Sequence, residues 1–324
     1  MTVLLITFSN DNESIPLVVK AIEAMGKKAF RFDTDLFPTE VKVDLYSGYK
    51  KGGVITDGDQ KLELKEVSAV WYRRMRYGQK LPDGMDRQFR EASLKECRLS
   101  IRGMIASLSG FHLDPIAKVD HANHKQLQLQ VARQLGLLIP GTLTSNNPEA
   151  VKQFAQEFEA TGIVTKMLSQ FAIYGDKQEE MVVFTSPVTK EDLDNLEGLQ
   201  FCPMTFQENI PKALELRITI VGEQIFTAAI NSQQLDGAIY DWRKEGRALH
   251  QQWQPYDLPK TIEKQLLELV KYFGLNYGAI DMIVTPDERY IFLEINPVGE
   301  FFWLELYPPY FPISQAIAEI LVNS

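Results

Sequence analysis

The chain is poor in cysteine, and this absence narrows the classes of protein to which it can belong. Only Cys97 and Cys202 occur, in no CxxC pair and no cysteine–histidine spacing. A disulfide scaffold and a zinc ribbon are disfavoured, and a reducing, cytoplasmic location is expected. No run of about 18 apolar residues is present, so no membrane span or membrane partner is expected. The apolar run at residues 3–8 has no positive segment before it, so it predicts a strand and not a signal peptide.

Positive charge is also in deficit. The 324 residues include 34 Lys and Arg against 43 Asp and Glu, which gives a net charge of −9. This balance disfavours a nucleic-acid partner, because such binding requires a basic surface. The length permits about two domains or one large α/β body. Residues 176–198 carry a net charge of −5 and residues 71–102 one of +5, so these are either solvated faces or docking surfaces for two ends of a charged partner.

Several familiar catalytic motifs are missing. The sequence contains no GxxxxGK[ST], no GxGxxG after the first strand, no GxSxG and no HExxH. The four histidines show no metal-ligand spacing. A hydrolase with a nucleophile of its own is therefore disfavoured.

Hydrophobic periodicity predicts a mixed α/β chain that opens in β-α-β order, as in a parallel sheet. An antiparallel, strand-rich segment follows. The predicted strands lie at 3–8, 28–32, 53–56, 61–64, 67–72, 162–167, 181–187, 200–207, 215–221, 224–230, 277–284 and 290–295. The predicted helices lie at 15–25, 83–108, 119–135, from 148 after an asparagine cap, at 258–273 and from 313.

Two apolar strands near the carboxyl end carry oxygen ligands. Glu294 and Asn296 lie two residues apart and share a strand face. If the turn 285–288 pairs Val284 with Arg289, Asp281 lies opposite Phe292 and on the same face as Glu294 and Asn296. Two carboxylates and an amide oxygen suit Mg²⁺. The alternative is that the carboxylates are solvated charges at the strand edge, although burying an unpaired charge in such apolar strands is costly.

Basic side chains also interrupt apolar strands. Lys166 lies in GIVTKML and Arg217 in ELRITIV. Each either extends outward to solvent or meets an anion inside a cleft.

In this order the motifs resemble the ATP-grasp ligases, an α/β (α+β grasp) fold. The resemblance implies a pre-ATP-grasp α/β domain at 1–115, a first grasp sub-domain with an acidic peptide-docking insertion at 116–200, and a C-terminal grasp sub-domain with the Mg²⁺ site at 201–324. Lys125 and Lys166 would bind the ATP phosphates, and Glu208 and Ile210 the adenine. Arg217 would steady the transferred phosphoryl group. The implied Mg²⁺ ligands are Asp281, Glu294 and Asn296.

A narrower resemblance covers nearly the whole chain. The opening MTVLLITFSNDNESI, the segment VWYRRMRY, the acidic insertion and DGAIYDWR are similar to the microviridin-type peptide macrocyclases. That family crosslinks a ribosomally made precursor peptide after ATP phosphorylates an Asp or Glu side chain. One branch closes esters with Thr or Ser hydroxyls and the other an amide with Lys; the ester branch is favoured here.

The same resemblance implies further roles. Arg243 would grip the acyl phosphate with Arg217, and Asp236 and Asp241 would orient it. Glu215 would meet the ribose or pair with Arg217. The covering loop, glycine-rich in many relatives, has only Gly175 in residues 168–180, so this segment either covers ATP or binds peptide.

Peptide docking is expected on charged surfaces. Glu191, Asp192 and Asn195, on an exposed turn, would receive an arginine of the leader, and the basic helix 83–102 would attract the acidic core. A homodimer is expected, and Phe301, Trp303 and Tyr307 are equally suited to a core, a substrate cleft or a dimer face. The alternatives are an ATP-grasp ligase that adds a free amino acid to a carboxylate and a non-catalytic nucleotide sensor or peptide-binding module.

Overall fold

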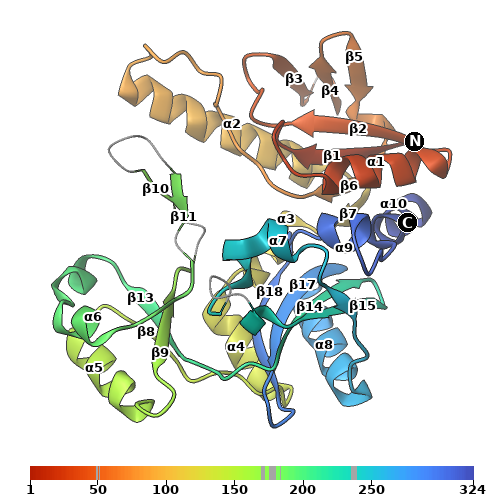
Figure 1. Cartoon of the computed structure of the whole chain (residues 1–324). Helices are drawn as coiled ribbons and strands as arrows, with labels where there is room; N and C mark the ends of the chain where they lie inside the picture. The colour runs from red at the N-terminus through yellow and green to blue at the C-terminus, as the bar shows by residue number, and fades with distance from the viewer. Residues whose placement is uncertain (49, 51, 169–171, 175–179, 183, 235–238) are drawn as a thin grey trace.

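A parallel sheet forms the centre of the N-terminal part of the structure (Figure 1). The structure is a computed structural model, and it describes residues 1–48, 50, 52–168, 172–174, 180–182, 184–234 and 239–324. The strand order is β2-β1-β6-β7. The strands are β1 (Thr2–Thr7), β2 (Lys28–Asp33), β6 (Val67–Tyr72) and β7 (Phe111–Leu113). Helix α1 (Ser14–Ala24) joins the first two, which confirms the predicted β-α-β opening. All of β1 is buried, which explains its unbroken apolar sequence.

A small antiparallel sheet and a long basic helix complete this region. The sheet contains β3 (Val41–Tyr46), β4 (Gly52–Asp57) and β5 (Gln60–Glu63), and the helix is α2 (Arg87–Ser107). Strand β3 was not predicted, although its alternation of apolar residues with Lys42 and Asp44 is a strand pattern. The helix begins later than residue 83, since the Asp86 side chain caps it by accepting from the Gln88 N–H.

A five-stranded antiparallel sheet forms the largest lobe, in the order β16-β15-β14-β17-β18. Its strands are β14 (Leu214–Val221), β15 (Gln224–Ile230), β16 (Gln254–Pro255), β17 (Tyr277–Val284) and β18 (Tyr290–Asn296). Helices α3 (Ile116–Ala122), α4 (Lys125–Gln134) and α8 (Lys260–Phe273) lie against one face. The short helix α7 (Gly246–Leu249) precedes β16.

The C-terminal helices connect the five-stranded lobe to the N-terminal sheet. Helices α9 (Phe302–Leu306) and α10 (Ile313–Asn323) pack on the second face of the five-stranded sheet. The same apolar cluster continues into β1 and α1, so α10 lies between the two sheets (Figure 1). Burial of this cluster is the main force that fixes the N-terminal region on the rest of the chain.

A third, smaller lobe has a four-stranded antiparallel sheet in the order β12-β9-β13-β8. It contains β8 (Thr142–Ser145), β9 (Ile163–Lys166), β12 (Ser186–Pro187) and β13 (Met204–Glu208), with helices α5 (Pro148–Glu157) and α6 (Lys190–Asp194). A hairpin of β10 (Ala172–Tyr174) and β11 (Glu180–Val182) rises from this lobe toward the N-terminal region (Figure 1).

Three further predicted elements differ from the structure. The helix predicted at 119–135 is two helices, because His124 is extended. The strand predicted at 181–187 is divided between β11 and β12, which pair in different sheets. The strand predicted from residue 200 begins at Met204, after a 3₁₀ turn at Glu197–Phe201. No helix in the described part of the chain is long and apolar enough to cross a bilayer.

Candidate active site

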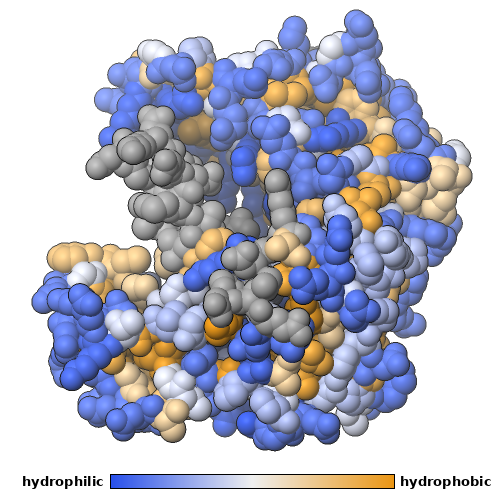
Figure 2. Space-filling model, viewed as in Figure 1, coloured by the Kyte–Doolittle hydropathy of each residue, from blue (hydrophilic) through white to orange (hydrophobic). Residues whose placement is uncertain are grey.

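Two adjoining cavities lie where the lobes meet. The inner cavity opens between the small lobe and the central sheet. The outer cavity extends from there to the N-terminal domain, with a volume of about 610 Å³. Figure 2 shows the molecule hollowed between that domain and the rest of the chain. Four charged side chains line both cavities: Lys166, Arg243, Asp281 and Glu294. A charged, concave boundary between lobes is a typical place for a small-molecule site.

The two carboxylates lie directly opposite each other on β17 and β18. Asp281 pairs with Glu294 because the register shifts by one residue between Asp281 and Met282. The predicted pairing of Asp281 with Phe292 is therefore wrong. The turn also differs, since Val284 pairs with Tyr290 and leaves five residues in the connection. The extra turn residue and the bulge together place Asp281 opposite Glu294.

Lys125 and Asn296 complete this cluster with Glu294. The ammonium of Lys125 lies 2.9 Å from Glu294 Oε2 and donates to Asn296 Oδ1 at 3.0 Å. The Asn296 amide donates to Glu294 Oε1 at 3.1 Å. Burial raises the pKa of the Glu294 carboxyl, but the ammonium groups of Lys125 and Lys166 outweigh it and hold that pKa below its usual value. Glu294 is therefore an anion at neutral pH.

The break between α3 and α4 positions Lys125. Because His124 is extended, Lys125 is the first residue of α4. One turn later, Gln128 is fully buried; its side chain donates to the Ile295 carbonyl at 2.8 Å and accepts from the Ile295 N–H at 3.0 Å. These bonds attach the start of α4 to β18, and the amino group of Lys125 thereby reaches the carboxylate cluster.

Lys166 and Arg243 face the same cluster from the other side. Burial lowers the pKa of the Lys166 ammonium, although Glu294 opposes this effect. The Arg243 guanidinium donates to both carboxylate oxygens of Asp241, at 2.7 and 2.6 Å. Burial lowers the pKa of Arg243, but these bonds outweigh it and raise that pKa above its usual value. Asp241 thus contacts Arg243 as expected, whereas Asp236 lies outside the described residues.

Arg217 is a buried cation beside this cluster. Only 5% of its surface is exposed. Its Nη1 lies 2.9 Å from Asp281 Oδ1, its Nη2 donates to the Glu300 carbonyl at 2.7 Å, and its Nε has no partner among the described residues. Burial disfavours the charge, but Asp281 outweighs it and raises the pKa of Arg217. The guanidinium is therefore always charged.

The inner cavity combines apolar and polar walls. Ile210, Ile283 and Leu293 lie together on one side of it. Glu208 also lines the cavity, with its backbone N–H donating to the Gly141 carbonyl at 2.9 Å. An apolar slot beside backbone groups suits a flat aromatic ring such as a nucleobase. The structure therefore brings Glu208 and Ile210 together, as the expected adenine site requires.

Glu215 also lines the inner cavity, and it pairs with Lys212 and not with Arg217. Its Oε1 accepts from Lys212 Nζ at 3.1 Å and from the Ser232 hydroxyl at 2.6 Å. Burial raises the pKa of Glu215, and Lys212 opposes this effect. The expected alternative of an Arg217 pair is therefore wrong, because Arg217 is occupied by Asp281.

The donors on β17 and β18 fit one kind of metal. No group of three His, Cys, Asp or Glu side chains within the described ranges is arranged to hold an ion. Two carboxylates and an amide oxygen, Asp281, Glu294 and Asn296, meet here instead. Such an all-oxygen set suits Mg²⁺, which retains waters and shares its ligands with phosphate oxygens.

Sequence reasoning missed a contact of the N-terminal domain with this site. Arg74 lies 2.5 Å from Glu300 Oε1, and both line the outer cavity. Arg73, 1% exposed, pairs with Asp11 at 3.1 Å and donates to the Gly299 carbonyl at 3.1 Å. In the sequence, the VWYRRMRY segment carries only a family resemblance and belongs to a basic region. Its partners in this cavity, Gly299 and Glu300, lie 226 residues away, so no local pattern indicates them.

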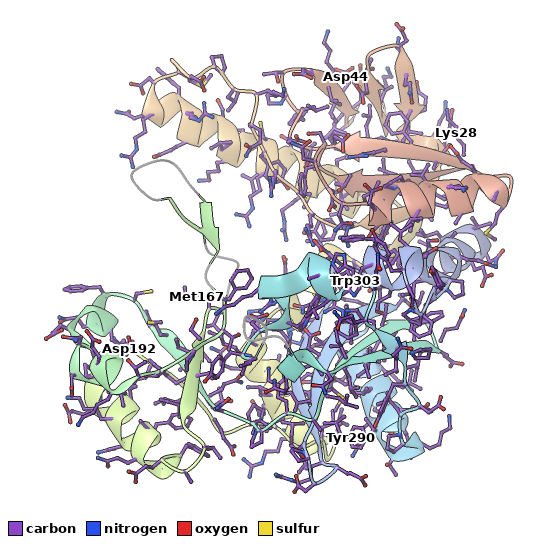
Figure 3. The ribbon with its side chains drawn as sticks, viewed as in Figure 1. Lys28, Asp44, Met167, Asp192, Tyr290 and Trp303 are labelled. Carbon is purple, nitrogen blue, oxygen red and sulfur yellow. The ribbon has the colours of Figure 1, made fainter. Side chains whose placement is uncertain are left out.

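The residues expected to receive the leader lie elsewhere. Glu191 and Asp192 belong to α6, a helix of five residues and not the expected turn, and Asn195 caps its end. The helix forms because Thr189 and Asp192 make a reciprocal capping box. Asp192 lies on the small lobe, far from Trp303 at the outer cavity (Figure 3). This site and the cavities are therefore separate surfaces.

Two remaining expectations concern aromatic and loop residues. Phe301 and Trp303 are buried in the core, and Trp303 also lines the outer cavity. Tyr307 is half-buried against the same core. Much of the 168–180 segment, including Gly175, lies outside the described residues.

Comparisons with known proteins agree across the chain. A family model described as the MvdD pre-ATP grasp domain matches residues 2–120. Macrocyclase MdnC from Microcystis aeruginosa MRC, solved bound with precursor peptide MdnA, is 91% identical with a TM-score of 0.92 over 100% of both chains. A Chryseobacterium gregarium RiPP-associated ATP-grasp ligase, solved with ADP and a leader and core peptide, is 38% identical with a TM-score of 0.92, over 99% of this chain and 96% of that one.

A second macrocyclase from Microcystis aeruginosa MRC, MdnB, is 38% identical with a TM-score of 0.84, over 100% of this chain and 99% of that one. No curated protein matches the chain.

Proposed function

The chain belongs to the microviridin-type ATP-grasp peptide macrocyclases, and we propose that it uses ATP and Mg²⁺ to close ester rings within a ribosomally made precursor peptide. The expected ATP-grasp fold with an N-terminal pre-ATP-grasp domain is confirmed. The observation that carries the proposal is the convergence of cations and carboxylates at the junction of the two cavities. Four of these groups face both cavities, so a nucleotide in one meets a peptide in the other.

The inner cavity is the proposed ATP site. Ile210 and Glu208 flank the adenine, and Lys125 and Lys166 hold the phosphates at the junction. Glu215 lines this cavity and would accept hydrogen bonds from the ribose hydroxyls. The bound ADP of the Chryseobacterium gregarium relative supports a nucleotide site in this fold.

Asp281, Glu294 and Asn296 are the proposed Mg²⁺ ligands. Mg²⁺ held there would neutralise charge on the phosphate oxygens. Lys125 and Arg217 already touch these ligands, so the cations of the chain lie where phosphate charge must be balanced.

The proposed reaction begins at a peptide carboxylate, which is inert toward alcohols until it is activated. The γ-phosphoryl group of ATP passes to the Asp or Glu side chain, giving an acyl phosphate and ADP. Arg217 and Arg243 would grip its oxygens, because a guanidinium presents a planar fork of donors. A Thr or Ser hydroxyl then attacks the acyl carbon, phosphate leaves and the ring closes.

A carboxylate in the outer cavity favours a hydroxyl over an amine as the attacking group. Glu300 lines that cavity. A nearby anion stabilises the ammonium form of lysine, which is not a nucleophile, whereas it accepts a hydrogen bond from a neutral hydroxyl. This supports the ester product.

The precursor peptide is the proposed partner, with its leader on Glu191, Asp192 and Asn195. The peptides bound to MdnC and to the Chryseobacterium gregarium ligase support such a partner. The expected homodimer stays a prediction.

The test is to incubate the purified protein with ATP, Mg²⁺ and a precursor peptide that carries leader and acidic core, and to measure product mass. We expect the loss of one water per ring, restored by mild base. A base-resistant loss would establish the amide product instead. Addition of a supplied free amino acid would establish the amino-acid ligase, and no change despite ATP binding would indicate a binding module. Chelation of Mg²⁺ should stop product formation.

A further inference from the structure

Ester closure requires a proton acceptor for the attacking hydroxyl, and the outer cavity provides three described carboxylates: Asp281, Glu294 and Glu300. The inference rests on the proposed function. Asp281 pairs with Arg217, and Glu294 pairs with Lys125. Both carboxylates are proposed to bind Mg²⁺. A carboxylate that shares its charge with a metal ion is a weak base. Glu300 is not among the proposed Mg²⁺ ligands.

The backbone brings Glu300 close to the reacting group. Its carbonyl oxygen accepts from Arg217 Nη2 at 2.7 Å, and the other nitrogen of that guanidinium reaches Asp281. The residue that carries the Glu300 carboxylate is therefore fixed to the arginine proposed to hold the acyl phosphate. A hydroxyl placed between the acyl carbon and Glu300 would meet both.

The N-terminal domain holds this carboxylate in the cavity. Arg74 lies 2.5 Å from Glu300 Oε1, and 35% of the Glu300 side chain remains exposed. Arg73 donates to the carbonyls of Val298 and Gly299, which immediately precede Glu300. The loop and the carboxylate are thus fixed by separate arginines. Arg74 contacts Oε1, so Oε2 is the oxygen that can face a substrate hydroxyl.

We propose that Glu300 is the catalytic base of ring closure and that Arg74 is a positioning residue for it. The hydroxyl oxygen attacks the acyl carbon as its proton passes to the Glu300 carboxylate. The new C–O bond forms, the bond from the acyl carbon to the phosphate oxygen breaks, and phosphate leaves with its electron pair. Glu300 then returns the proton to the departing phosphate or to water, so the residue is unchanged after each ring.

His250 is the competing proton acceptor because it also lines the outer cavity. Its ring stacks on Trp303 with a centroid distance of 5.8 Å and an interplanar angle of 13°, and its edge meets Phe302. These contacts orient the imidazole as part of an aromatic wall. Glu300 is hydrogen-bonded through its carbonyl to the arginine proposed to hold the acyl phosphate, so Glu300 is the better placed group.

The experiment compares Glu300→Gln with wild type in one assay that measures ADP and cyclised peptide separately. Glutamine keeps the shape but cannot take the proton. We expect ring formation to fall by about 100-fold or more, the usual range for removal of a general base. ADP formation should persist, because Glu300 has no part in phosphoryl transfer. Hydroxylamine should then trap the accumulated acyl phosphate as a hydroxamate on the peptide.

Two further variants separate the roles. Arg74→Met keeps the carboxylate but removes its fixed position, so ring formation should fall less than in Glu300→Gln while more ADP is formed per ring. Glu268→Gln, at an exposed position of α8, is the matched control and should behave as wild type. Thermal stabilisation by ATP should be equal in all variants, which shows that they are folded.

The outcomes are distinguishable. If wild type forms no dehydrated peptide, the proposed function fails, and this inference fails with it. If wild type forms rings and Glu300→Gln forms the same number of rings per ADP as wild type, only the assignment of Glu300 is overturned. The assignment is equally overturned if His250→Gln, and not Glu300→Gln, separates ADP formation from ring closure.

Discussion

Arg217 and Asp281 lie directly opposite each other on β14 and β17, with 2.9 Å between guanidinium Nη1 and carboxylate Oδ1. The pair joins the cation proposed to hold the acyl phosphate to a proposed Mg²⁺ ligand. Because both lie in hydrogen-bonded strands, neither can move far without the other. The proposed phosphate and metal sites are therefore held at a fixed separation before any ligand arrives.

Arg217→Ala should damage stability and activity together. Removing one member of a buried pair leaves Asp281 uncompensated and costs about 3 kcal/mol of unfolding free energy. Arg217→Lys keeps the charge but loses the fork, so it should remain more stable while ring formation still falls by about 100-fold. Urea unfolding and product mass measure the two effects. Arg133→Ala, an exposed arginine of α4, is the control, and wild-type ring formation by Arg217→Lys would contradict the assignment.

The sequence predicted the bounds of these strands better than the pairing between them. Strands β15 and β17 have the predicted bounds because their apolar runs end at turn residues. The partner of Asp281 was predicted wrongly, since a five-residue connection and a bulge have no clear composition signal. Apolar residues with helical spacing likewise continue across His124, while the break depends on the tertiary contact of Gln128 with β18.

The contribution of the N-terminal domain could not be predicted at all. Arg74 and Glu300 are 226 residues apart, and each lies in a segment whose local pattern has an ordinary explanation. Their contact depends on how α10 packs between the two sheets. Local periodicity determines elements, whereas this contact depends on the arrangement of whole lobes.

The proposed leader site on α6 can be tested through its charge and through its helix cap separately. Glu191→Gln with Asp192→Asn should weaken leader-peptide affinity about tenfold, the scale of one charge-assisted hydrogen bond. Asparagine still accepts the capping bonds from Thr189, so the helix is retained. Thr189→Ala is the control. It loses the helix cap, which lowers the stability by about 1 kcal/mol, but it keeps the charges of Glu191 and Asp192. Fluorescence anisotropy of a labelled leader measures affinity; unchanged binding by the double variant would refute the site.

Nucleotide affinity should depend on pH through Lys166. Burial lowers the pKa of this ammonium from 10.5, so it loses its proton at a lower pH than an exposed lysine does. Phosphate binding requires the protonated form, and affinity for ATP should therefore fall as pH rises through the lowered pKa. The stability of the protein without ATP depends on pH in the opposite direction. Between the lowered pKa and 10.5 the unfolded chain binds more protons than the folded chain, so the contribution of Lys166 to the free energy of unfolding rises with pH.

Calorimetric titration with ATP at increasing alkaline pH measures this dependence. Lys166→Arg is the matched variant because a guanidinium keeps its charge throughout that range. It should bind ATP with little loss of affinity at high pH. Equal pH dependence in wild type and Lys166→Arg would show that another group controls binding.

Gly299 precedes the proposed base and lies where the loop contacts the central sheet. A Cβ atom there would come within 2.4 Å of Ala279 Cβ and 2.9 Å of Arg217 Nη2. Gly299→Ala must therefore shift the loop or the guanidinium, and such overpacking costs about 1 to 3 kcal/mol. Because Arg217 and Glu300 would both be displaced, ring formation should fall by more than ADP formation.

Gly103→Ala is the matched control for this substitution. Gly103 lies inside α2, and an added Cβ has nothing within 4 Å. Alanine favours the helix over glycine by about 0.5 to 1 kcal/mol, so this variant should be slightly more stable than wild type and equally active. Melting temperatures and the ratio of rings to ADP measure the contrast. A Gly299→Ala variant that keeps the wild-type ratio would show that ring closure tolerates movement of the 298–300 loop, and the fixed position argued for Glu300 would be unnecessary.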